Sequence, residues 1–267
     1  MEVQPKPEFY GQPYASAFQE SGVADAYRHR PGYPDEAIEI VISLLVDAPR
    51  AVLDVGCGTG FLARRLVDRV DRIDAVDISS PMVERGKRLP GGDHPHLHWI
   101  TGAVEDSPLN PPYALITAGD SLHWMDWYAV LPRFARMLTP NGYLAILGVE
   151  NVPPPWEDDI RALIRRYSTV PNWQYFDLVA GLEERGLFRR AGARTTTPVA
   201  FEQSIEEYVE SFHGRASLPR ERLGPANAAA FDEAVRGLVG PVCGGMVELQ
   251  IVTNVVWGKP LGAPQTI

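Results

Sequence analysis

Apolar runs and amphipathic helical patterns alternate along the first part of the chain. A helix is predicted from Pro34, because apolar side chains then recur at helical spacing, at Ile38, Val41, Ile42 and Leu45. Five short apolar runs beyond it are typical of buried strands, and helical patterns lie between them. The strands are predicted over 51–55, 72–77, 97–101, 113–117 and 143–149, and the helices over 60–68, 80–88 and 127–138. This alternation favours a parallel sheet with helices on both faces.

Three consecutive prolines, Pro153–Pro155, interrupt the alternation. Beyond them the pattern predicts helices over 156–168, 174–186, 204–213 and 225–238, and strands over 194–201 and 247–256. The last strand is mostly apolar, as expected in a buried sheet. The chain is therefore divided into an N-terminal arm and helix (1–33), an α/β core (34–150), a helical cap with one core strand near 194–201 (151–246), and a final core strand with a tail (247–267).

Charge and composition narrow the classes of partner. The formal net charge of −9 argues against nucleic acid, because proteins that bind its phosphates usually present a basic face. No apolar run reaches the roughly 20 residues needed to span a bilayer, so no membrane partner is expected. The first eight residues lack the apolar core of a signal peptide, and Cys57 and Cys243 are expected to be free thiols. These features predict a protein of the cytoplasm.

The stretch from Val52 to Gly60, Val-Leu-Asp-Val-Gly-Cys-Gly-Thr-Gly, is the most informative part of the sequence. An apolar strand enters a turn with glycine at every second position, Gly56, Gly58 and Gly60, and a helical pattern follows. Because glycine has no Cβ, a ligand can approach the backbone closely there, at the carboxyl end of a parallel strand. The stretch therefore predicts a ligand-binding turn.

Asp77 ends the next predicted strand, about twenty residues after the turn, the spacing of a ribose-binding acid on the adjacent strand. Its carboxylate can accept hydrogen bonds from both ribose hydroxyl groups. A structural role stays open, because Ser79, Ser80 and Pro81 open a predicted helix that Asp77 could cap.

These residues carry a resemblance to a known family. The segments 54–60 and 75–82 together resemble the class I S-adenosylmethionine (SAM) methyltransferases, whereas a dinucleotide fingerprint would have a third glycine where Phe61 stands. Residues 113–117 resemble the family's fourth strand, and 131–146 its passage into the fifth.

Two shorter passages resemble one branch of that family. Arg28–Pro34 and Leu122–Trp124 are similar to the small-molecule branch that contains trans-aconitate methyltransferase and related type 11 methyltransferases. The resemblance implies a doubly wound, mostly parallel, seven-stranded Rossmann-like sheet. Its last two strands would be the two predicted beyond residue 190, one of them antiparallel, and the helical cap would cover the pocket of the methyl acceptor.

The resemblance also implies SAM as cofactor and assigns residues to it. The three glycines would approach its methionyl and ribose parts, and Asp54 would orient the turn or face the methionyl ammonium. The family often has an acid where Ala103 stands, so the Val104 backbone and the Glu105 side chain are expected to meet the adenine instead. The remaining assignments are Asp77 to the ribose, Ile78 and Met82 to the faces of the adenine, and Gly119, just past the fourth strand, to the pocket wall.

Arg30 is a candidate clamp for the SAM carboxylate, because a guanidinium group matches carboxylate geometry. A salt bridge that ties the arm to the body of the protein is an equally good interpretation. Tyr27 and Tyr33, on either side of Arg30 in the chain, have the same two interpretations.

His123 is the candidate catalytic residue. It follows the fourth strand at the edge of the sheet where acceptors meet SAM, and a histidine there could deprotonate a hydroxyl or orient a carboxylate. The alternative is a packed histidine beside Trp124, before a helix that starts at Asp126. His94, His96 and His98 have the spacing of a zinc site but are interrupted by Pro95, so they are interpreted as a surface loop and no metal is expected.

The sequence therefore predicts a SAM-dependent methyltransferase that acts on a small molecule, most simply on an oxygen of a hydroxyl or carboxylate group. Two other functions stay open. One is a SAM-binding enzyme of the same fold with a non-methylating reaction such as cyclisation, and the other is an inactive SAM-binding partner subunit. Much of the rate of methyl transfer can come from positioning alone, so no conspicuous catalytic cluster is required.

Overall fold

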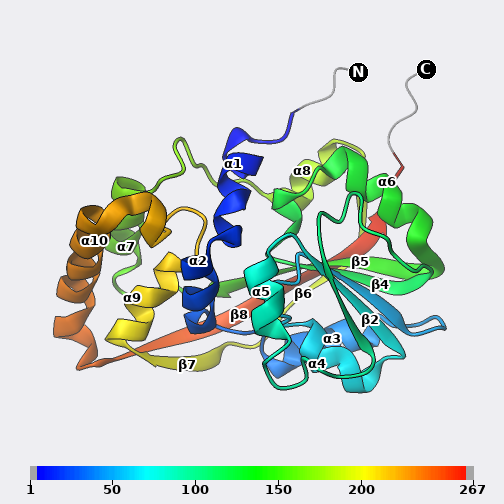
Figure 1. Ribbon diagram of the computed structural model, residues 1–267, viewed down its shortest axis with the longest axis horizontal. Coiled ribbons are helices and arrows are strands. Elements are labelled where there is room, and N and C mark those ends of the chain that lie inside the picture. Colours follow the sequence, from blue (N-terminus) through cyan, green and yellow to red (C-terminus); the bar gives the residue numbers. More distant parts are fainter. Residues whose placement is uncertain (1–4, 263–267) are drawn as a thin grey trace.

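The computed structural model describes residues 5–262, which leaves the ends of the predicted arm and tail outside the described residues. Its centre is one mixed sheet in the order β3-β2-β1-β4-β5-β8-β6, with β7 also paired to β8 (Figure 1). All the pairings from β3 to β5 are parallel, and β8 runs antiparallel to β5, β6 and β7. The strands are β1 (Ala51–Val55), β2 (Arg72–Asp77), β3 (Leu97–Thr101), β4 (Tyr113–Gly119), β5 (Leu138–Asn151), β6 (Phe188–Thr195), β7 (Val199–Ser204) and β8 (Met246–Pro260).

Helices connect the strands and cover the sheet. The α-helices are α1 (Gln12–Ala15), α2 (Ser21–Ala26), α3 (Asp35–Ser43), α4 (Ala63–Leu66), α5 (Ser80–Gly86), α6 (Trp127–Met137), α7 (Glu157–Tyr167), α8 (Leu178–Glu184), α9 (Ile205–His213) and α10 (Arg220–Cys243). Short 3-10 turns are η1 (Glu8–Tyr10), η2 (Ser16–Gln19), η3 (Tyr27–His29), η4 (Val67–Arg69) and η5 (Leu122–Trp124).

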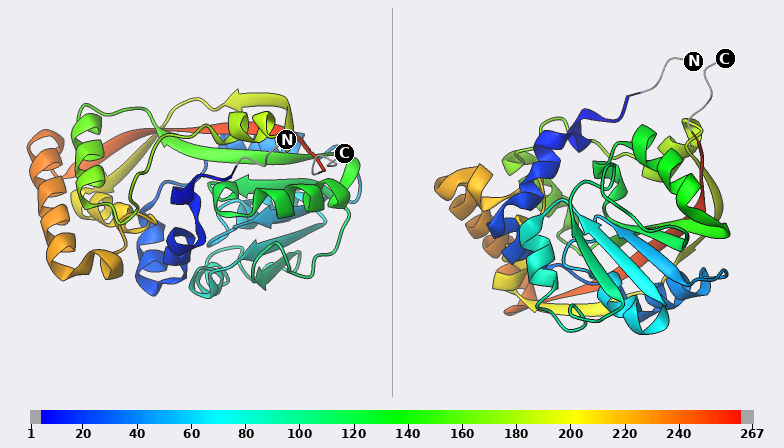
Figure 2. Two further views of the ribbon diagram at one scale, coloured as in Figure 1. Left: turned by 90° about the horizontal axis from the view of Figure 1, so that it is seen from above. Right: turned by 45° about the vertical axis from the view of Figure 1, so that its right-hand side comes forward.

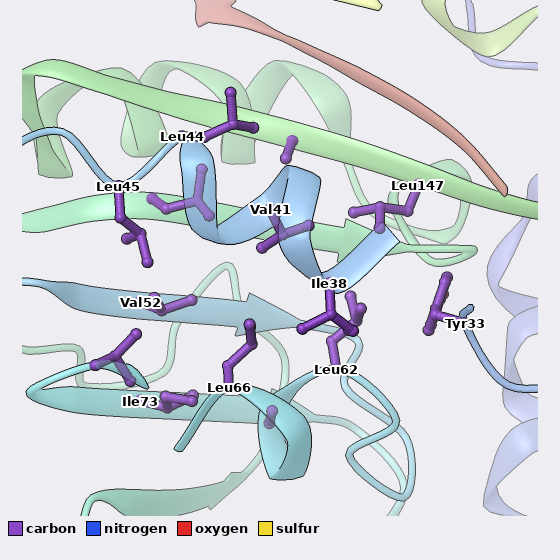
Figure 3. Packing of buried hydrophobic residues seen from close by; sticks show 14 of the residues in the cluster. Tyr33, Ile38, Val41, Leu44, Leu45, Val52, Leu62, Leu66, Ile73 and Leu147 are labelled. Atoms are coloured by element: carbon purple, nitrogen blue, oxygen red, sulfur yellow. The ribbon is translucent and has the colours of Figure 1, made fainter. Parts of the chain in front are cut away.

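Each face of the parallel half of the sheet has its own hydrophobic core. On one face Ile38 and Val41 of α3 pack with Leu66 of α4 over Val52 and Ile73 of the strands (Figure 3). The other face is covered by α6 and α8, whose buried side chains meet alternate residues of β1, β4 and β5. Burial on both faces explains why the parallel strands are apolar at nearly every position.

A third core belongs to the cap, defined here as α7, α9, α10, β7 and the first half of β8. Its centre is Phe231 of α10, which packs edge-to-face against Phe212 of α9 and Tyr167 of α7. Figures 1 and 2 show these helices gathered at one end of β8, whose other end lies in the parallel sheet. One strand of 15 residues thus runs through both the cap and the core.

The N-terminal segment, residues 5–29, lies between the cap and the core (Figure 1, blue). It is fixed to the core where the Ser79 hydroxyl donates to Phe18 O (2.5 Å) and where Lys6 Nζ donates to Trp124 O (3.2 Å). It is fixed to the cap by Arg222 of α10, which donates to Pro13 O (2.7 Å) and pairs with Glu20 (2.6 Å). The segment therefore forms a wall between the two regions.

The sequence-based boundaries match closely in the core and less well in the cap. Strands 51–55, 72–77 and 97–101 have the predicted limits, but the predicted helix 60–68 is α helix only over 63–66. Helix 174–186 is shortened to 178–184, and helix 225–238 extends over 220–243 with a kink at Gly224.

The predicted single strand near 194–201 is wrong. Two strands, β6 and β7, flank residues 196–198, so the sheet has eight strands where seven were expected. Both strands pair with β8 on its outer side and are largely exposed, with polar sequences such as Phe-Arg-Arg-Ala-Gly-Ala-Arg-Thr in β6. An exposed edge strand lacks the apolar pattern by which buried strands are recognised.

Candidate active site

A pocket opens at the carboxyl edge of the parallel strands, against the N-terminal segment. It holds about 820 Å³ of space free of atoms, part of it open to solvent. Ten of the residues assigned from the sequence line it: Arg30, Gly56, Gly58, Asp77, Ile78, Met82, Ala103, Val104, Glu105 and Gly119. Asp54, Gly60 and His123 do not line it.

The glycine turn adopts a backbone that other residues rarely reach. Gly56, Gly58 and Gly60 all have positive φ (62°, 55° and 77°), where a Cβ is strained. A Cβ on Gly56 would lie 2.4 Å from Ser121 Cβ, and one on Gly60 would lie 2.6 Å from Trp99. Gly58 is different, because its nearest neighbour would be Tyr27 at 3.7 Å. Gly56 and Gly60 are therefore required because a side chain there would clash with its neighbours. Gly58 has no such clash, and its lack of a side chain leaves space in the pocket.

Asp77 is fixed by the backbone of two turns. Its Oδ2 accepts a hydrogen bond from Gly58 N (2.7 Å) and its Oδ1 one from Ser79 N (2.7 Å). Burial raises the pKa of Asp77, and these two amides oppose that rise. The N-cap of α5 is Ser79, whose hydroxyl accepts from Met82 N, so the capping role left open for Asp77 belongs to Ser79. Two bonds leave about two of the four acceptor positions of a carboxylate for ribose hydroxyls.

The loop after β3 supplies polar backbone to the pocket. Val104 lines it, and the backbone amide of Val104 has no hydrogen-bond partner among residues 5–262. Glu105 also lines it, but its Oε1 already accepts from Asp126 N (3.0 Å), the N-cap of α6. The free amide of Val104 therefore fits the edge of an adenine better than the Glu105 carboxylate does.

Arg30 lines the pocket with its guanidinium over the Tyr27 ring, 5.1 Å from the ring centroid. In the described part of the chain Arg30 makes no ion pair, so the salt bridge considered from the sequence is not formed there. Burial lowers the pKa of Arg30, but the Tyr27 phenol and then the Asp120 carboxylate outweigh this effect, so the pKa is raised. Tyr33 is buried beside them, and its hydroxyl would lie 2.2 Å from a Cβ on Gly119.

Asp54 lies behind the turn rather than in the pocket. It is 2% exposed, its Oδ1 accepts from the Thr117 hydroxyl (2.8 Å), and its Oδ2 has no hydrogen-bond partner with normal geometry among residues 5–262. Burial raises the pKa of Asp54 to about 7, although Thr117 and the backbone of Ala63 oppose the rise. Of its two predicted roles, this position favours orientation of the turn.

Asp120 is a pocket residue that the sequence did not single out. It follows β4 in a left-handed conformation (φ 49°), and its carboxylate accepts from Val149 N (3.3 Å). Non-glycine residues adopt this backbone uncommonly, with Asp among the more tolerant. The sequence shows only that an acid follows the strand. Other pocket residues that the sequence analysis did not assign are Gln12, Ala15, Phe18, Val76, Gly102, Ser121, Trp124 and Met125.

His123 lies under the N-terminal segment. Its ring packs against Tyr10 (4.8 Å between ring centroids) and Trp124 (4.7 Å), and it has no hydrogen-bond partner within 5–262. Burial lowers the pKa of His123 to about 3, and the positive charges of Lys6 and Arg30 add to the effect. A base with that pKa is weak at neutral pH. The geometry therefore agrees better with the packed histidine than with the general base.

Of the three histidines, His94 and His96 precede β3 and pack against each other (5.0 Å between ring centroids), whereas His98 lies within the strand. His94 lies 3.4 Å from Asp68, and His98 Nδ1 lies 3.2 Å from Asp74. Within the described residues, no group of three or more metal-ligating side chains is close enough to hold an ion, and no helix is long and apolar enough to cross a membrane.

Comparison with known proteins agrees with the fold. Residues 52–142 match a family described as methyltransferase domain. An uncharacterised methyltransferase of Mycobacterium tuberculosis (strain H37Rv) is 37% identical over 129 residues, 48% of this chain and 50% of the relative. Trans-aconitate 2-methyltransferase of Acidovorax sp. (strain JS42) is 28% identical over 193 residues, 66% of this chain and 72% of the relative. The chain thus spans about half the length of the mycobacterial relative.

A solved structure supports the fold alone. A proposed type II methyltransferase from Anaeromyxobacter dehalogenans superposes with a TM-score of 0.62 at 20% identity, over 87% of this chain and 99% of that one. The matched segment 52–142 contains the glycine turn, Asp77 and Val104. Residues 52–142 therefore match a methyltransferase domain, and this similarity supports a class I S-adenosylmethionine-dependent methyltransferase with S-adenosylmethionine as its cofactor.

Proposed function

We propose that the protein transfers a methyl group from SAM to an oxygen of a small molecule. One observation carries the proposal: the pocket brings the glycine turn, the fixed Asp77 carboxylate and the free Val104 amide together at the carboxyl edge of a parallel sheet. Ligands bind at that edge in open α/β folds. The spacing and chemistry of these groups fit a ribose and an adenine side by side.

The charges around the pocket fit the methionyl part of SAM. That part is a zwitterion, with one carboxylate and one ammonium group. Arg30 and Asp120 both line the pocket, interact electrostatically, and form no ion pair with each other within the described residues. We assign the methionyl carboxylate to Arg30 and the ammonium to Asp120, beside Gly119. Each buried charge would then gain a counter-charge.

Among the described residues that line the pocket there is no histidine, lysine or cysteine to act as a general base, which favours a carboxylate over a hydroxyl acceptor. A hydroxyl must lose its proton before it attacks, whereas a carboxylate is ionised at neutral pH. In a carboxylate transfer the acceptor oxygen bonds to the methyl carbon while the carbon–sulfur bond breaks and its electron pair stays on sulfur. No proton moves, so a neutral His123 with a pKa near 3 is no obstacle. The relative named trans-aconitate 2-methyltransferase is consistent with an acidic acceptor.

The test uses methyl-labelled SAM with two panels of acceptors, carboxylic acids that include trans-aconitate, and phenols or alcohols. We expect S-adenosylhomocysteine and labelled product in equal amounts with at least one acid. The label should be released by mild alkali, because methyl esters hydrolyse and methyl ethers do not. A labelled methyl ether would show that the acceptor group is a hydroxyl and not a carboxylate. S-adenosylhomocysteine without labelled product, or no turnover with any oxygen acceptor despite SAM binding, would contradict methyl transfer to oxygen.

A further inference from the structure

Arg215 lies where the cap meets the wall of the pocket. It follows Gly214, the C-cap of α9, and this glycine is pressed against the N-terminal segment. A Cβ on Gly214 would lie 3.2 Å from the Cα of Tyr27 and 3.3 Å from the carbonyl carbon of Ala26. The end of α9 is therefore docked on the turn that carries Tyr27 and leads to Arg30. Figure 1 shows α9 beside α2 at this junction.

Within residues 5–262 the guanidinium of Arg215 makes no ion pair and no hydrogen bond. It lies over the ring of Phe212, with 4.9 Å between the guanidinium carbon and the ring centroid. The three arginines of α10 are paired: Arg220 with Glu210 and Asp232, Arg222 with Glu20, and Arg236 with Glu206. Arg215, which precedes this helix, has no such pair within residues 5–262.

The acids near Arg215 are engaged elsewhere. Glu157, at the start of α7, pairs with Arg161 (2.7 Å), and Asp120 accepts a hydrogen bond from Val149 and acts on Arg30. Arg215 interacts electrostatically with both acids and with Tyr208, but at distances that form no ion pair. The groups around it therefore come from the pocket wall on one side and from the cap on the other.

Arg30, which also has no ion pair within the described residues, repels the positive charge of Arg215. Without a bound anion, the charged form of Arg215 is therefore destabilised. Burial and, after it, the positive charge of Arg30 together lower the pKa of Arg215 to about 10. A buried, unpaired charge is costly, and an arginine in that state is a ready partner for a carboxylate or phosphate, which it can bind with two parallel hydrogen bonds.

We propose that Arg215 binds an anionic group of the methyl acceptor, a carboxylate or a phosphate, on the cap side of the SAM pocket. The proposal rests on the proposed function for the identity of the acceptor, and it adds a second requirement: besides the oxygen that is methylated, the acceptor carries a further negative charge. Arg30 then serves the cofactor and Arg215 the acceptor. An acceptor with one polar end and an apolar remainder would leave Arg215 unpaired.

The experiment measures binding of small anions to the protein saturated with S-adenosylhomocysteine. Citrate, succinate and inorganic phosphate are the probes, titrated by calorimetry against wild type, Arg215→Gln, Arg215→Lys and Arg165→Gln. Arg165 is an exposed arginine on α7 and matches the change in net charge. We expect Arg215→Gln to weaken binding of the best probe about 10–100-fold, the scale of hydrogen bonds to a charged group. Arg215→Lys should retain part of the affinity, and Arg165→Gln all of it.

Affinity for S-adenosylhomocysteine, measured in the same variants, separates the two arginines. It should be unchanged in Arg215→Gln. If that affinity falls instead, Arg215 serves the cofactor and the proposal is overturned. Equal probe binding in wild type and Arg215→Gln, or no probe binding by wild type at millimolar concentration, overturns it as well. Preference for phosphate over both carboxylates would identify the anion as a phosphate.

The binding result is independent of turnover. Probe binding that depends on Arg215, in a protein that methylates no oxygen acceptor, would refute the proposed function and keep the anion site. If Arg215→Gln methylates an acid with the same Michaelis constant as wild type, the proposed function stands and the anion site at Arg215 is refuted. If Arg215→Gln fails to fold, the comparison of Arg215→Lys with wild type decides, because lysine keeps the charge but loses the paired hydrogen bonds.

Discussion

The two sides of the pocket are built in different ways. The cofactor side is mostly backbone: three glycines with positive φ, the amides that hold Asp77, and the free amide of Val104. The cap side is made of side chains whose positions depend on contacts between distant parts of the chain, such as Gly214 against Tyr27. A site made of backbone groups is determined by a short stretch of sequence. A site made of side chains from distant parts of the chain forms only once the cap has folded against the core.

The largest expected effect compares the hydrophobic centres of the two regions. Phe231 in the cap and Phe134 of α6 in the core are both fully buried, so Phe231→Ala and Phe134→Ala should each lower the free energy of unfolding by about 3–5 kcal/mol. Both variants should unfold in one transition, because β8 runs through both regions. Thermal unfolding followed by circular dichroism measures this. A separate early transition in Phe231→Ala would show that the cap is an independent unit.

A second prediction separates packing from ligand contact within the glycine turn. Gly56→Ala combines a left-handed backbone with a clash against Ser121, and should lower stability by about 2–4 kcal/mol. Gly58→Ala has room for its Cβ, so only about 1–2 kcal/mol of backbone strain is expected. Its methyl group enters the pocket, however, and should weaken S-adenosylhomocysteine binding. Equal affinities of Gly58→Ala and wild type in a calorimetric titration would show that the cofactor does not touch this turn.

Two acids on β2 provide a third, matched pair. Asp77→Asn replaces one carboxylate oxygen by an NH₂ group, which would face a backbone N–H instead of accepting from it. The free energy of S-adenosylhomocysteine binding should become about 1.5–3 kcal/mol less favourable. Asp74, on the same strand, accepts from the Tyr113 hydroxyl (2.5 Å) outside the pocket. Asp74→Asn should lower the melting temperature and leave affinity unchanged. The interpretation of Asp77 as a ribose ligand fails if both variants bind the cofactor as well as wild type.

The smallest expected effect concerns His123 and has a defined pH window. Its native pKa of about 3 lies below the unfolded value of about 6.5. Between these values the unfolded chain binds a proton that the native state does not, so this group's contribution to stability is lost as the pH falls below 6.5. The loss between pH 7.5 and pH 5 is about 2 kcal/mol. Denaturant unfolding at both pH values should show it as a difference: on acidification the free energy of unfolding should fall by about 2 kcal/mol more in wild type than in His123→Gln, because all other titrating groups are common to both.

The same variant tests catalysis by His123. Because the histidine is neutral at physiological pH, turnover should show no titration near pH 6.5, and His123→Gln should keep turnover within about tenfold of wild type. A fall of about 10²–10⁴, the usual contribution of a general base, together with a flattened pH profile, would restore His123 to the catalytic role inferred from its position in the sequence.

Local signals in the sequence explain which parts could be predicted. The parallel strands, the glycine turn and the N-cap at Asp126 were predictable because each depends on a few adjacent residues with distinct chemistry. The exposed strand β6 was not, because its polar residues have no core to face. The pKa of His123 depends on burial under Tyr10 and on Lys6, more than a hundred residues away in the chain. Arg215 gave no signal, since an arginine after a predicted helix has no distinctive pattern.

The contacts of the N-terminal segment have a consequence for the order of folding. Residues 5–29 line the pocket, yet their anchors lie far along the chain, at Ser79, at Trp124 and at Arg222, which is 209 positions from Pro13. Closing loops of that length costs chain entropy that is recovered only after the anchors are in place. The glycine turn, held by neighbouring strands, can form early. The wall opposite it is therefore expected to dock in the last and slowest step, and refolding followed by cofactor binding should lag behind recovery of the secondary structure.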